Sequence, residues 1–402
     1  MLLRAVQCRR LHVGLIDVAM NRRRFLCAVA GMGPASAIAA TGGRRPAGTI
    51  DVKELGAFGN GRLPDLRQLR EAIRLAGERP TGTIIFFPPG EYFLGVADDT
   101  VLLDAQRLRN VRFVGNRATL TCRSIAGQST MLQLSGCRGV TVEGINFRDH
   151  GLKRDINWLG AAAIRVTNLG GTACEEIQVR SCEFDSVLAA LVCRKSDDHP
   201  QTRCTEIRLT EITVNRSYYG FNFQDDGDHV VGRGLRCNDV KRSYFTFGVS
   251  NHDIELETTN NATGFTDVLI KCYHRDTSRI KAKIKSRGKR GGDAIVALDH
   301  QHDQGRGAIR HVDLQLDIGD VDCALDAAVL IRSFDPKARH EKQTNNRWED
   351  ISIEGDVDIC DKTRVIDIAT IGRTPGALRI GPRLAKHPRL PRSFPGFTVS
   401  GL

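Results

Sequence analysis

The feature that most constrains this 402-residue chain is a series of short segments in which apolar and polar residues alternate. They begin near residue 105 and recur every few tens of residues, with Gly-, Asn- and Asp-rich punctuation and no long helical pattern between them; examples are NVRFVG, GVTVEGINF, EEIQVRSCEF, TEIRLTEITV, HVDLQLDI and WEDISIEGDV. Such alternation is the pattern of a β-strand with one buried face. Strands this short cannot bury that face alone, so their repetition predicts stacked coils. A β-sandwich is the alternative.

The segment before the repeats, residues 48–94, predicts a cap on the stack. Asp65 is placed to cap a helix that runs to Ala76, with Leu66, Leu69, Ile73 and Ala76 on one face. The apolar strand TIIFF follows, and Pro88-Pro89-Gly90 then turns the chain sharply.

This segment resembles the N-terminal cap of the pectate-lyase-like superfamily of right-handed parallel β-helices. The matching residues are Val52, Gly56-Ala57-Phe58-Gly59, Gly61 and Phe87-Pro88-Pro89-Gly90-Glu91-Tyr92. The family usually has paired acids before the helix, where this chain reads Arg62-Leu63-Pro64-Asp65. The resemblance implies an all-β, right-handed parallel β-helix (pectin-lyase-like) with an N-terminal helical cap. We expect the cap over 48–100, the β-helix over 101–375, and a Pro/Arg-rich tail over 376–402 that covers the final coil loosely.

A closer repeat aligns RSYYGFNFQDD, residues 216–226, with RSYFTFGVSNH, residues 242–252, at an offset of 26. SRIKAKIKSR, residues 278–287, follows in the same pattern. If these are successive coils of one sheet, alternation gives three stacked inward sets: Tyr219, Phe221, Phe223, then Phe245, Phe247, Val249, then Ile280, Ala282, Ile284. The outward face would then carry Asn222, Gln224, Thr246, Ser250, Arg279, Lys281, Lys283 and Lys285.

The stretch YYGFNFQDDGDH, residues 218–229, crowds three aspartates and a histidine at the end of an alternating run. Two carboxylates can divide the work of glycoside hydrolysis, because one protonates the leaving oxygen while the other activates water. We predict that Asp225 and Asp226 form this catalytic pair and that His252 assists them. The alternative interpretation is a solvated Asp/Gly turn.

The lysine-rich strand predicts a surface for polyanions. Ammonium groups two residues apart on one exposed face repel one another, and a polyanion lying on them relieves that repulsion. We predict that Arg279, Lys281 and Lys283 hold uronate carboxylates, with Asn222 and Gln224 as further substrate contacts. A lysine beside other cations has a lowered pKa and could also serve as a base. Edge protection or solubility is the alternative.

Two further resemblances concern the same residues. Polygalacturonase-type glycoside hydrolases carry N-T-D, Q-D-D, G-H-G and R-I-K motifs in order, and this chain has Gln224-Asp225-Asp226 and Arg279-Ile280-Lys281. In that family the paired Asp serve acid/base chemistry, and the Arg and Lys hold the substrate carboxylate. No N-T-D precedes the pair here, and Asn251-His252-Asp253 is the nearest substitute for G-H-G.

The second resemblance is to mannuronan C5-epimerases and related alginate enzymes, which show Y-G-F-D-P-H-D. This chain reads Tyr219-Gly220-Phe221 and then Asn222, Phe223, Gln224 and Asp225, so amides replace the family's acid and histidine. The family's usual proton transfer would be compromised by that replacement.

No metal site is assigned, and no cofactor is certain. Calcium at the aspartates is the favoured candidate because it prefers hard oxygen ligands. His300 and His302, in DHQHD, alternate on one strand and form a weaker candidate pair for a transition metal. In the insertion RDHGLKRDINW, residues 148–158, Trp158 is a candidate for stacking on a sugar ring, with a structural plug as the alternative.

Residues 1–39 form an export signal region. NRRRFLCAVAGMGPASAIAA, residues 21–40, has a basic start, a short apolar core and small residues near its end. Arg22-Arg23-Arg24-Phe25-Leu26 resembles the twin-arginine signal, which exports folded proteins, and Met20 is a candidate true start. We therefore expect the twin-arginine machinery as a partner and a periplasmic or secreted location. A basic amphipathic anchor is the alternative. No stable membrane insertion is expected after cleavage, because no run of eighteen apolar residues exists.

Charge and cysteine content bound the partners. Removal of residues 1–39 takes away six arginines and one aspartate, so the net charge falls from +11 to +6 and the chain stays basic. Exported basic proteins often meet polyanions, and no nucleic-acid module appears, so an acidic polysaccharide is the expected partner. Most of the twelve cysteines are expected to be small buried residues, although Cys193 and Cys204 flank RKSDDHPQTR and could bridge it.

Together these observations predict an exported protein that cleaves glycosidic bonds of a uronate-containing polysaccharide by hydrolysis. The alternatives are a polysaccharide lyase or C5-epimerase, and a non-catalytic glycan-binding β-helix protein. Fold alone does not decide among them.

Overall fold

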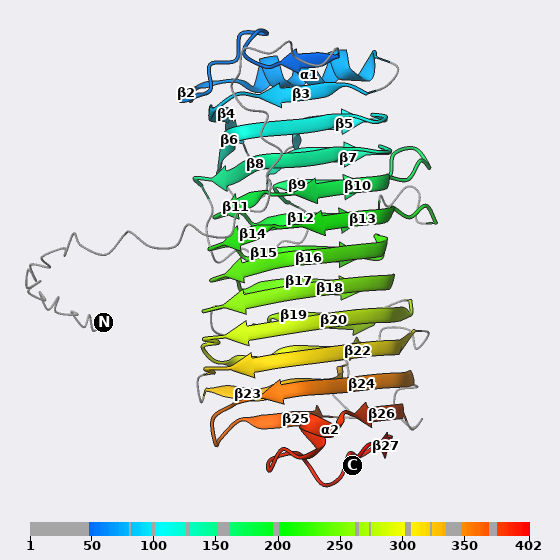
Figure 1. Cartoon of the computed structure of the whole chain (residues 1–402). Coiled ribbons are helices and arrows are strands. Elements are labelled where there is room, and N and C mark those ends of the chain that lie inside the picture. Colours follow the sequence, from blue (N-terminus) through cyan, green and yellow to red (C-terminus); the bar gives the residue numbers. More distant parts are fainter. Residues whose placement is uncertain are drawn as a thin grey trace, which may run out of the picture. The chain divides into compact units, whose positions relative to one another are not determined.

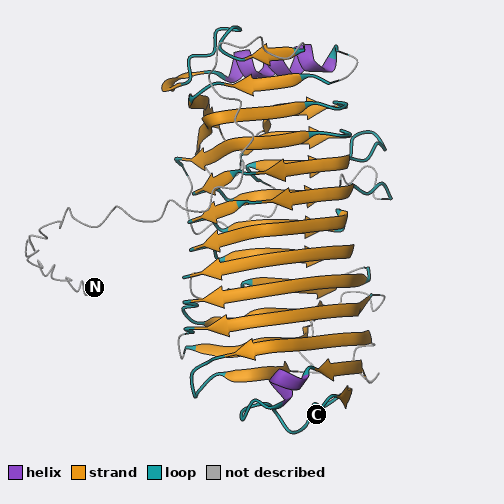
Figure 2. Cartoon of the chain, in the orientation of Figure 1, coloured by secondary structure: helices purple, strands orange, loops and turns teal. Residues whose placement is uncertain are grey.

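The computed structural model describes residues 48–402 apart from the segments 80–81, 98–100, 126–128, 152–160, 196–200, 262–264, 273–274, 302–306, 322–323, 335–346 and 370–375. Residues 1–39, which we predict to be an export signal, therefore lie outside the described residues, as do Trp158 and His302. Within the described part, strands dominate and form two parallel sheets, as Figure 2 shows.

Sheet A contains 17 of the described strands. They are β1 (Thr49–Asp51), β2 (Asn60–Pro64), β3 (Ile84–Phe87), β4 (Gly90–Ala97), β6 (Arg112–Ser124), β8 (Thr141–Asp149), β10 (Glu175–Arg180), β11 (Glu183–Asp185), β13 (Thr205–Thr210), β14 (Thr213–Asn215), β16 (Asp228–Asn238), β18 (Ser250–Thr259), β20 (Thr277–Arg287), β22 (Ala308–Gly319), β24 (Arg347–Val357), β26 (Gly376–Ile380) and β27 (Phe397–Ser400).

Sheet B contains the other 10 described strands. They are β5 (Val101–Gln106), β7 (Thr130–Ser135), β9 (Ile164–Thr167), β12 (Ala189–Arg194), β15 (Tyr219–Gln224), β17 (Arg242–Phe247), β19 (Val268–Cys272), β21 (Gly292–Gln301), β23 (Leu325–Phe334) and β25 (Arg364–Ala369). From β5 onward the chain alternates between the sheets, so each coil adds strands to both (Figure 1). This architecture is a right-handed parallel β-helix, as the sequence predicts.

The predicted cap helix is confirmed as α1 (Leu66–Gly77), which buries Leu69, Ala72, Ile73 and Ala76 against the first coils. Asp65 precedes the helix but makes no side-chain capping bond. Its fully buried carboxylate instead accepts the backbone N–H groups of Phe58, at 2.5 Å, and Gly59, at 3.2 Å. Gly90 lies so close to this segment that an added Cβ would sit 2.6 Å from the carbonyl oxygen of Gly59. The two glycine-containing motifs of the cap thus pack on each other.

One apolar core runs through the coils, because alternate residues of both sheets point inward. Strand register corrects the predicted repeat: Tyr219 pairs with Arg242, an offset of 23 residues rather than 26. The difference is odd, so it reverses the face of every residue in the second strand. Phe221 and Phe223 point into the core as predicted, whereas Phe245 and Phe247 point outward.

The register also corrects two other expectations. The lysine-rich strand β20 belongs to sheet A, between β18 and β22, and not to the sheet that contains β15. The residues after 375 do not lie loosely, because β26 pairs with β24 and β27 pairs with β26. The short helix α2 (Pro382–Ala385) follows β26 and places Leu384 in the core.

The cysteines are mostly small buried residues, as expected. Eight of those in the described residues are free and buried, namely Cys122, Cys137, Cys174, Cys182, Cys193, Cys204, Cys237 and Cys272. Cys193 and Cys204 therefore do not form the bridge that their flanking positions suggested. Cys360 is disulfide-bonded, and its partner lies outside the described residues. No helix in the described ranges has both the length and the apolar composition needed to cross a membrane.

Candidate functional site

The predicted lysine surface lies on the outward face of sheet A. Lys281, Lys283 and Lys285 are exposed on β20, whose alternate residues fill the core. Acidic side chains of both neighbouring strands lie in register with them: Asp253, Glu255 and Glu257 on β18, and Asp313 and Asp317 on β22. The ammonium group of Lys285 is 2.8 Å from the carboxylate of Glu257. Flanking acids compensate the lysine column, which weakens its attraction for a polyanion.

Two open hollows lie on this face of sheet A. One, of about 500 Å³, is lined by Arg279 and Lys281 together with Asp253, His311, Asp313 and Asp350. The other, of about 590 Å³, is lined by Lys283 and Lys285 together with Glu255, Glu257, Asp317 and Glu354. Both hollows thus mix the two signs of charge.

The predicted catalytic pair does not assemble on a common surface. Asp225 follows β15 in a left-handed conformation, with φ of 51°, and its carboxylate is 4.0 Å from the ammonium of Lys195. Asp226 is 0% exposed, and its Oδ1 accepts the backbone N–H groups of Cys204, at 2.5 Å, and Gly227, at 2.9 Å. Burial raises the pKa of Asp226. Its carboxylate is grouped with the buried thiols of Cys193 and Cys204 and not with the outward rows of either sheet.

His252 is buried in the core, and it also borders the hollow lined by Arg279 and Lys281, so the structure brings these three predicted site residues together. Its ring is 5.0 Å from the Phe223 ring, its Nδ1 accepts the hydroxyl of Tyr244, and its Nε2 donates to the carbonyl of Gly227 at 2.6 Å. Burial lowers the pKa of His252 to about 3, so the imidazole is neutral at ordinary pH. This arrangement stabilises the corner after β15.

The outward face of sheet B carries two rows of side chains in register. The apolar row is Val192, Asn222, Phe245, Leu269, Ala297 and Leu330, and the polar row is Arg194, Gln224, Phe247, Lys271, Asp299 and Arg332. Asn222 is the polar exception in the first row. It is 0% exposed, and neither its amide nitrogen nor its amide oxygen has a hydrogen-bond partner among the described residues. An unpaired buried amide costs roughly 1–3 kcal/mol, so it calls for an explanation.

Three charged residues occupy neighbouring places in the polar row. Lys271 lies in register with Asp299, which lies in register with Arg332. The carboxylate Oδ2 of Asp299 is 3.6 Å from Arg332, and its buried Oδ1 has no hydrogen-bond partner among the described residues. Burial raises the pKa of Asp299 against the opposing effect of the two cations, and burial lowers the pKa of Lys271. Both groups are thereby moved toward their neutral forms.

Aromatic rings and cations continue this surface beside the apolar row. The guanidinium of Arg242 lies 5.4 Å from the Phe245 ring and 5.6 Å from the Phe265 ring. Tyr218 packs edge-on against Phe265 with ring centroids 5.4 Å apart. Burial lowers the pKa of Arg242, although a guanidinium remains charged. The two aromatic rings hold the guanidinium of Arg242 in place by cation–π attraction.

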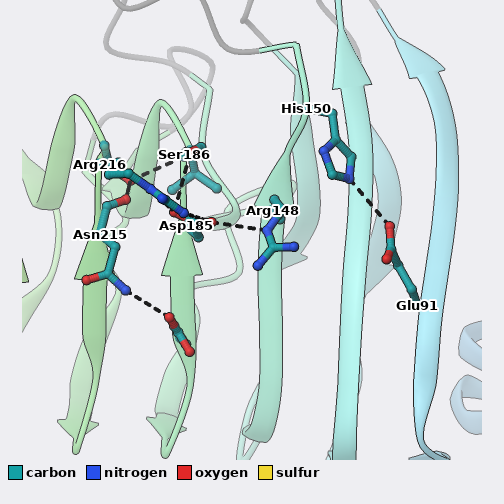
Figure 3. Close-up of polar contacts among 10 residues, drawn as sticks. Glu91, Arg148, His150, Asp185, Ser186, Asn215 and Arg216 are labelled. Carbon is teal, nitrogen blue, oxygen red and sulfur yellow. Dashed lines mark hydrogen bonds and ion pairs between the residues drawn. The ribbon is translucent and has the colours of Figure 1, made fainter. Parts of the chain in front are cut away.

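A separate charged cluster lies where strands of sheet A end, beside the start of the 148–158 insertion (Figure 3). Asp185 is nearly buried and binds the guanidinium groups of Arg148, at 3.1 Å, and Arg216, at 2.5 Å. His150 lies 3.4 Å from Glu91. The two arginines hold the pKa of Asp185 below its usual range against the opposing effect of burial. The ion pairs of Asp185 tie three coils together.

The predicted metal ligands do not converge. Asp228 binds Arg203 at 3.0 Å and accepts the backbone N–H of Ser250 at 2.8 Å, so each aspartate after β15 has different neighbours. His300 points inward, with its Nε2 2.9 Å from the Gly307 carbonyl. The arrangement does not favour a calcium ion shared among these carboxylates, and the His300–His302 pair remains a prediction.

Comparison with known proteins gives the fold class. No protein-family model matches the chain, and no curated protein matches it. The Agl-KA catalytic domain is 14% identical, with 89% of this chain and 69% of that chain covered and a TM-score of 0.50. This likeness supports the fold and no more. The protein has the right-handed parallel β-helix fold.

Two further solved structures are similar to the chain at lower TM-scores. The A-module of the Azotobacter vinelandii mannuronan C-5 epimerase AlgE4 is 16% identical, covers 87% of this chain and 100% of its own, and has a TM-score of 0.41. An exopolygalacturonase from Thermotoga maritima is 11% identical, covers 82% of this chain and 93% of its own, and has a TM-score of 0.38. Likenesses at this level carry no argument about activity.

Sequence reasoning missed Lys271, Asp299, Arg332 and Arg242. A signal existed, because VLIKC, IVALDH and VLIRS each place one charged residue after an apolar run. Aligning those three segments would have put the charges in one row.

Proposed function

We propose that this protein is exported and acts on a uronate-containing polysaccharide at the outward face of sheet B. The observation that carries the proposal is the polar row, in which Lys271, Asp299 and Arg332 lie side by side and partly removed from water. The fully buried, unpaired amide of Asn222 in the adjacent row is a second feature that calls for an explanation. A ligand that supplies hydrogen bonds and a carboxylate satisfies both features.

The row suits proton abstraction next to a carboxylate. Arg332 and Arg242 supply cations that neutralise the uronate carboxylate and so acidify the C5 proton. Lys271, whose pKa is lowered, transfers that proton from C5 to its Nζ. Asp299, whose pKa is raised, donates a proton to the leaving oxygen as the C4–O bond breaks and a C4–C5 double bond forms. Return of a proton to the opposite face of C5 gives epimerisation instead.

Hydrolysis by Asp225 and Asp226 was the prediction from sequence, and it requires a different arrangement. Inverting and retaining mechanisms both need two carboxyl groups on either side of the scissile bond. The carboxylate of Asp226 instead accepts two backbone N–H groups inside the coils of the β-helix. We therefore favour elimination or epimerisation over hydrolysis.

The test is a panel of acidic polysaccharides incubated with the mature protein. New reducing ends and new unsaturated uronate are measured in the same tubes, and deuterium exchange at C5 is measured in heavy water. Unsaturation, or exchange without cleavage, supports the proposal. Reducing ends without unsaturation contradict it and restore the aspartate pair. Absence of all three signals across the panel, with and without calcium, also overturns it.

Non-catalytic glycan binding is the second candidate, and the hollows on sheet A favour it. Arg279, Lys281 and Lys283 line these hollows and can contact carboxylates between the acidic columns. Polysaccharide binding that survives Lys271→Ala but fails in the double variant Lys281→Ala/Lys283→Ala would assign recognition to sheet A. The reverse pattern would assign it to sheet B.

Export rests on the sequence of residues 21–40. Replacing Arg22, Arg23 and Arg24 by lysine is expected to leave the precursor in the cytoplasm, because the twin-arginine machinery requires arginine. Fractionation of cells that express the chain from Met1 or from Met20 tests both the signal and the start. Unchanged export of the triple-lysine variant would reject this pathway.

A further inference from the structure

A column of buried thiols runs along one inner corner of the coils. The backbone N–H of Cys137 donates to Sγ of Cys174 at 3.2 Å, and that of Cys174 donates to Sγ of Cys204 at 3.4 Å. In the next coil the backbone N–H of Cys204 donates to Oδ1 of Asp226. Asp226 therefore occupies the place that cysteine holds in the preceding coils. A carboxylate in this position is an exception within an otherwise apolar interior.

A third side chain completes a cluster around Asp226. Cys193, from β12, joins Cys204 and Asp226, and one ligand atom from each lies within 4.8 Å of the others. All three residues are at or near complete burial. Ligand atoms around a tetrahedral zinc ion are about 3.3–3.8 Å apart, so a small contraction would bring these three to that geometry.

The carboxylate of Asp226 has an unused ligand position. Its Oδ1 accepts two backbone N–H groups, but its Oδ2 is buried without a hydrogen-bond partner among the described residues. Burying a carboxylate in this way is costly unless a cation or a proton compensates it. The unpartnered oxygen is on the residue that shares the cluster with both thiols.

We propose that Cys193, Cys204 and Asp226 form a structural zinc site inside the β-helix. Two sulfur ligands and one oxygen ligand suit a borderline ion such as Zn²⁺ better than calcium or magnesium, which take oxygen alone. Binding releases the two thiol protons, and the carboxyl proton where present, so that two thiolates and one carboxylate face the ion.

The surroundings suit the excess negative charge of such a site. Sγ of Cys204 accepts the N–H of Cys174, and Oδ1 of Asp226 accepts those of Cys204 and Gly227. The cation of Arg203 also favours the ionised form of Asp226. Hydrogen bonds of this kind orient metal ligands and stabilise them. The ion would link β12 to the residue before β13 and to the corner that follows β15.

Complete burial has a consequence for loading. All three ligands are buried among the described residues, so zinc enters while the chain folds and leaves when it unfolds. The site is therefore structural, and it is independent of the activity proposed for sheet B.

The test uses the mature protein expressed with zinc in the medium. Elemental analysis is expected to find about one equivalent of zinc per chain, released to a chromophoric chelator only on denaturation. Refolding with Co²⁺ alone is expected to give the near-ultraviolet charge-transfer bands of thiolate–cobalt ligation. Cys193→Ser, Cys204→Ser and Asp226→Asn are each expected to reduce retained metal about tenfold or more.

Cys237→Ser and Cys272→Ser are the matched controls, because both cysteines are fully buried and lie outside the cluster. They are expected to retain the metal content of the parent. The cobalt spectrum of the parent keeps the test decisive even where a ligand variant fails to fold. A parent protein without zinc after expression and refolding, and without cobalt bands, overturns the proposal. Equal metal in Asp226→Asn and parent overturns the assigned ligands.

Discussion

On sheet A, the lysines of β20 stand in water between two acidic columns, whereas on sheet B Lys271 and Arg332 lie partly buried on either side of Asp299. Exposed charges in register cost little and interact weakly, so their presence needs no function. Charges withdrawn from water cost free energy unless something compensates them. The lysines of β20 are the more conspicuous charges in the sequence, but the partly buried row on sheet B says more about function.

The largest expected effect distinguishes the two faces by turnover. Lys271→Ala removes the proposed base and is expected to lower turnover about 100-fold or more. Lys285→Ala, on sheet A, is expected to leave turnover nearly unchanged, because its ammonium group pairs with Glu257 at the surface. Initial rates on the active polysaccharide measure both. Equal losses of turnover in Lys271→Ala and Lys285→Ala would contradict the assignment of catalysis to sheet B.

The second prediction concerns apolar residues that face outward. Phe245 is 4% exposed and packs with Leu269, Ala297 and Leu330, so Phe245→Ala is expected to lower the free energy of unfolding by about 3 kcal/mol. Val231 on sheet A is 39% exposed, and Val231→Ala is expected to change the free energy of unfolding by less than about 0.5 kcal/mol. Urea denaturation measures both. A small loss at Phe245 would mean that the outward face of sheet B is not a packed surface.

The third prediction uses the lowered pKa of Lys271. Above its folded pKa and below the ordinary lysine value of 10.5, the unfolded chain binds the proton that the folded chain has lost. Stability attributable to Lys271 therefore rises with pH across that window. Lys271→Met is expected to flatten this rise, whereas Lys285→Met is not. Unfolding free energies measured from pH 7 upward test it, and an unchanged slope in Lys271→Met would refute it.

The raised pKa of Asp299 has the opposite sign. Between the ordinary value of 3.8 and its folded pKa, the folded chain holds the extra proton, so stability attributable to Asp299 falls as pH rises through that window. Asp299→Asn is expected to remove this fall. Unfolding midpoints across mildly acidic pH provide the measurement, and a steeper fall in the variant would contradict the assignment.

The smallest effect is expected for the surface pair on sheet A. A double-mutant cycle of Lys285→Ala and Glu257→Ala is expected to give a coupling of about 0.2–1 kcal/mol that decreases with added salt. A coupling of several kcal/mol would show that sheet A also holds its charges out of water. In that case the charges of sheet A and sheet B would not differ in their exposure to water.

The fold was predictable because its determinants are local. Alternation identifies strands, and the cap residues from Val52 to Tyr92 identify how the stack begins. The strand register was not predictable in this way. The sequence repeat aligns Tyr218 with Tyr244, whereas the strands pair Phe221 with Tyr244. Turn lengths differ between coils, and an odd error exchanges the two faces of a strand. Sequence repeats also do not say to which of two sheets a strand belongs.

The candidate site was harder to predict for the same reason. Asp225 and Asp226 are adjacent, so an extended chain already directs them to different sides. His252 alternates with Ile254 and Leu256, which both lie in the core, and that spacing indicates an inward ring. Lys271, Asp299 and Arg332 come from three coils and meet only through register. No sequence pattern within a single coil predicts that these three residues form a row.

The two ends of the β-helix differ in how firmly they are closed. At one end α1 buries an apolar face against the first strands, while at the other β27 has no buried residue and pairs only with β26 among the described strands. In a stack whose coils contact only their neighbours, separation proceeds from an end. Under mechanical load we therefore expect the coils to separate one after another, first at the C-terminal end near residue 400 and last at the cap that α1 covers.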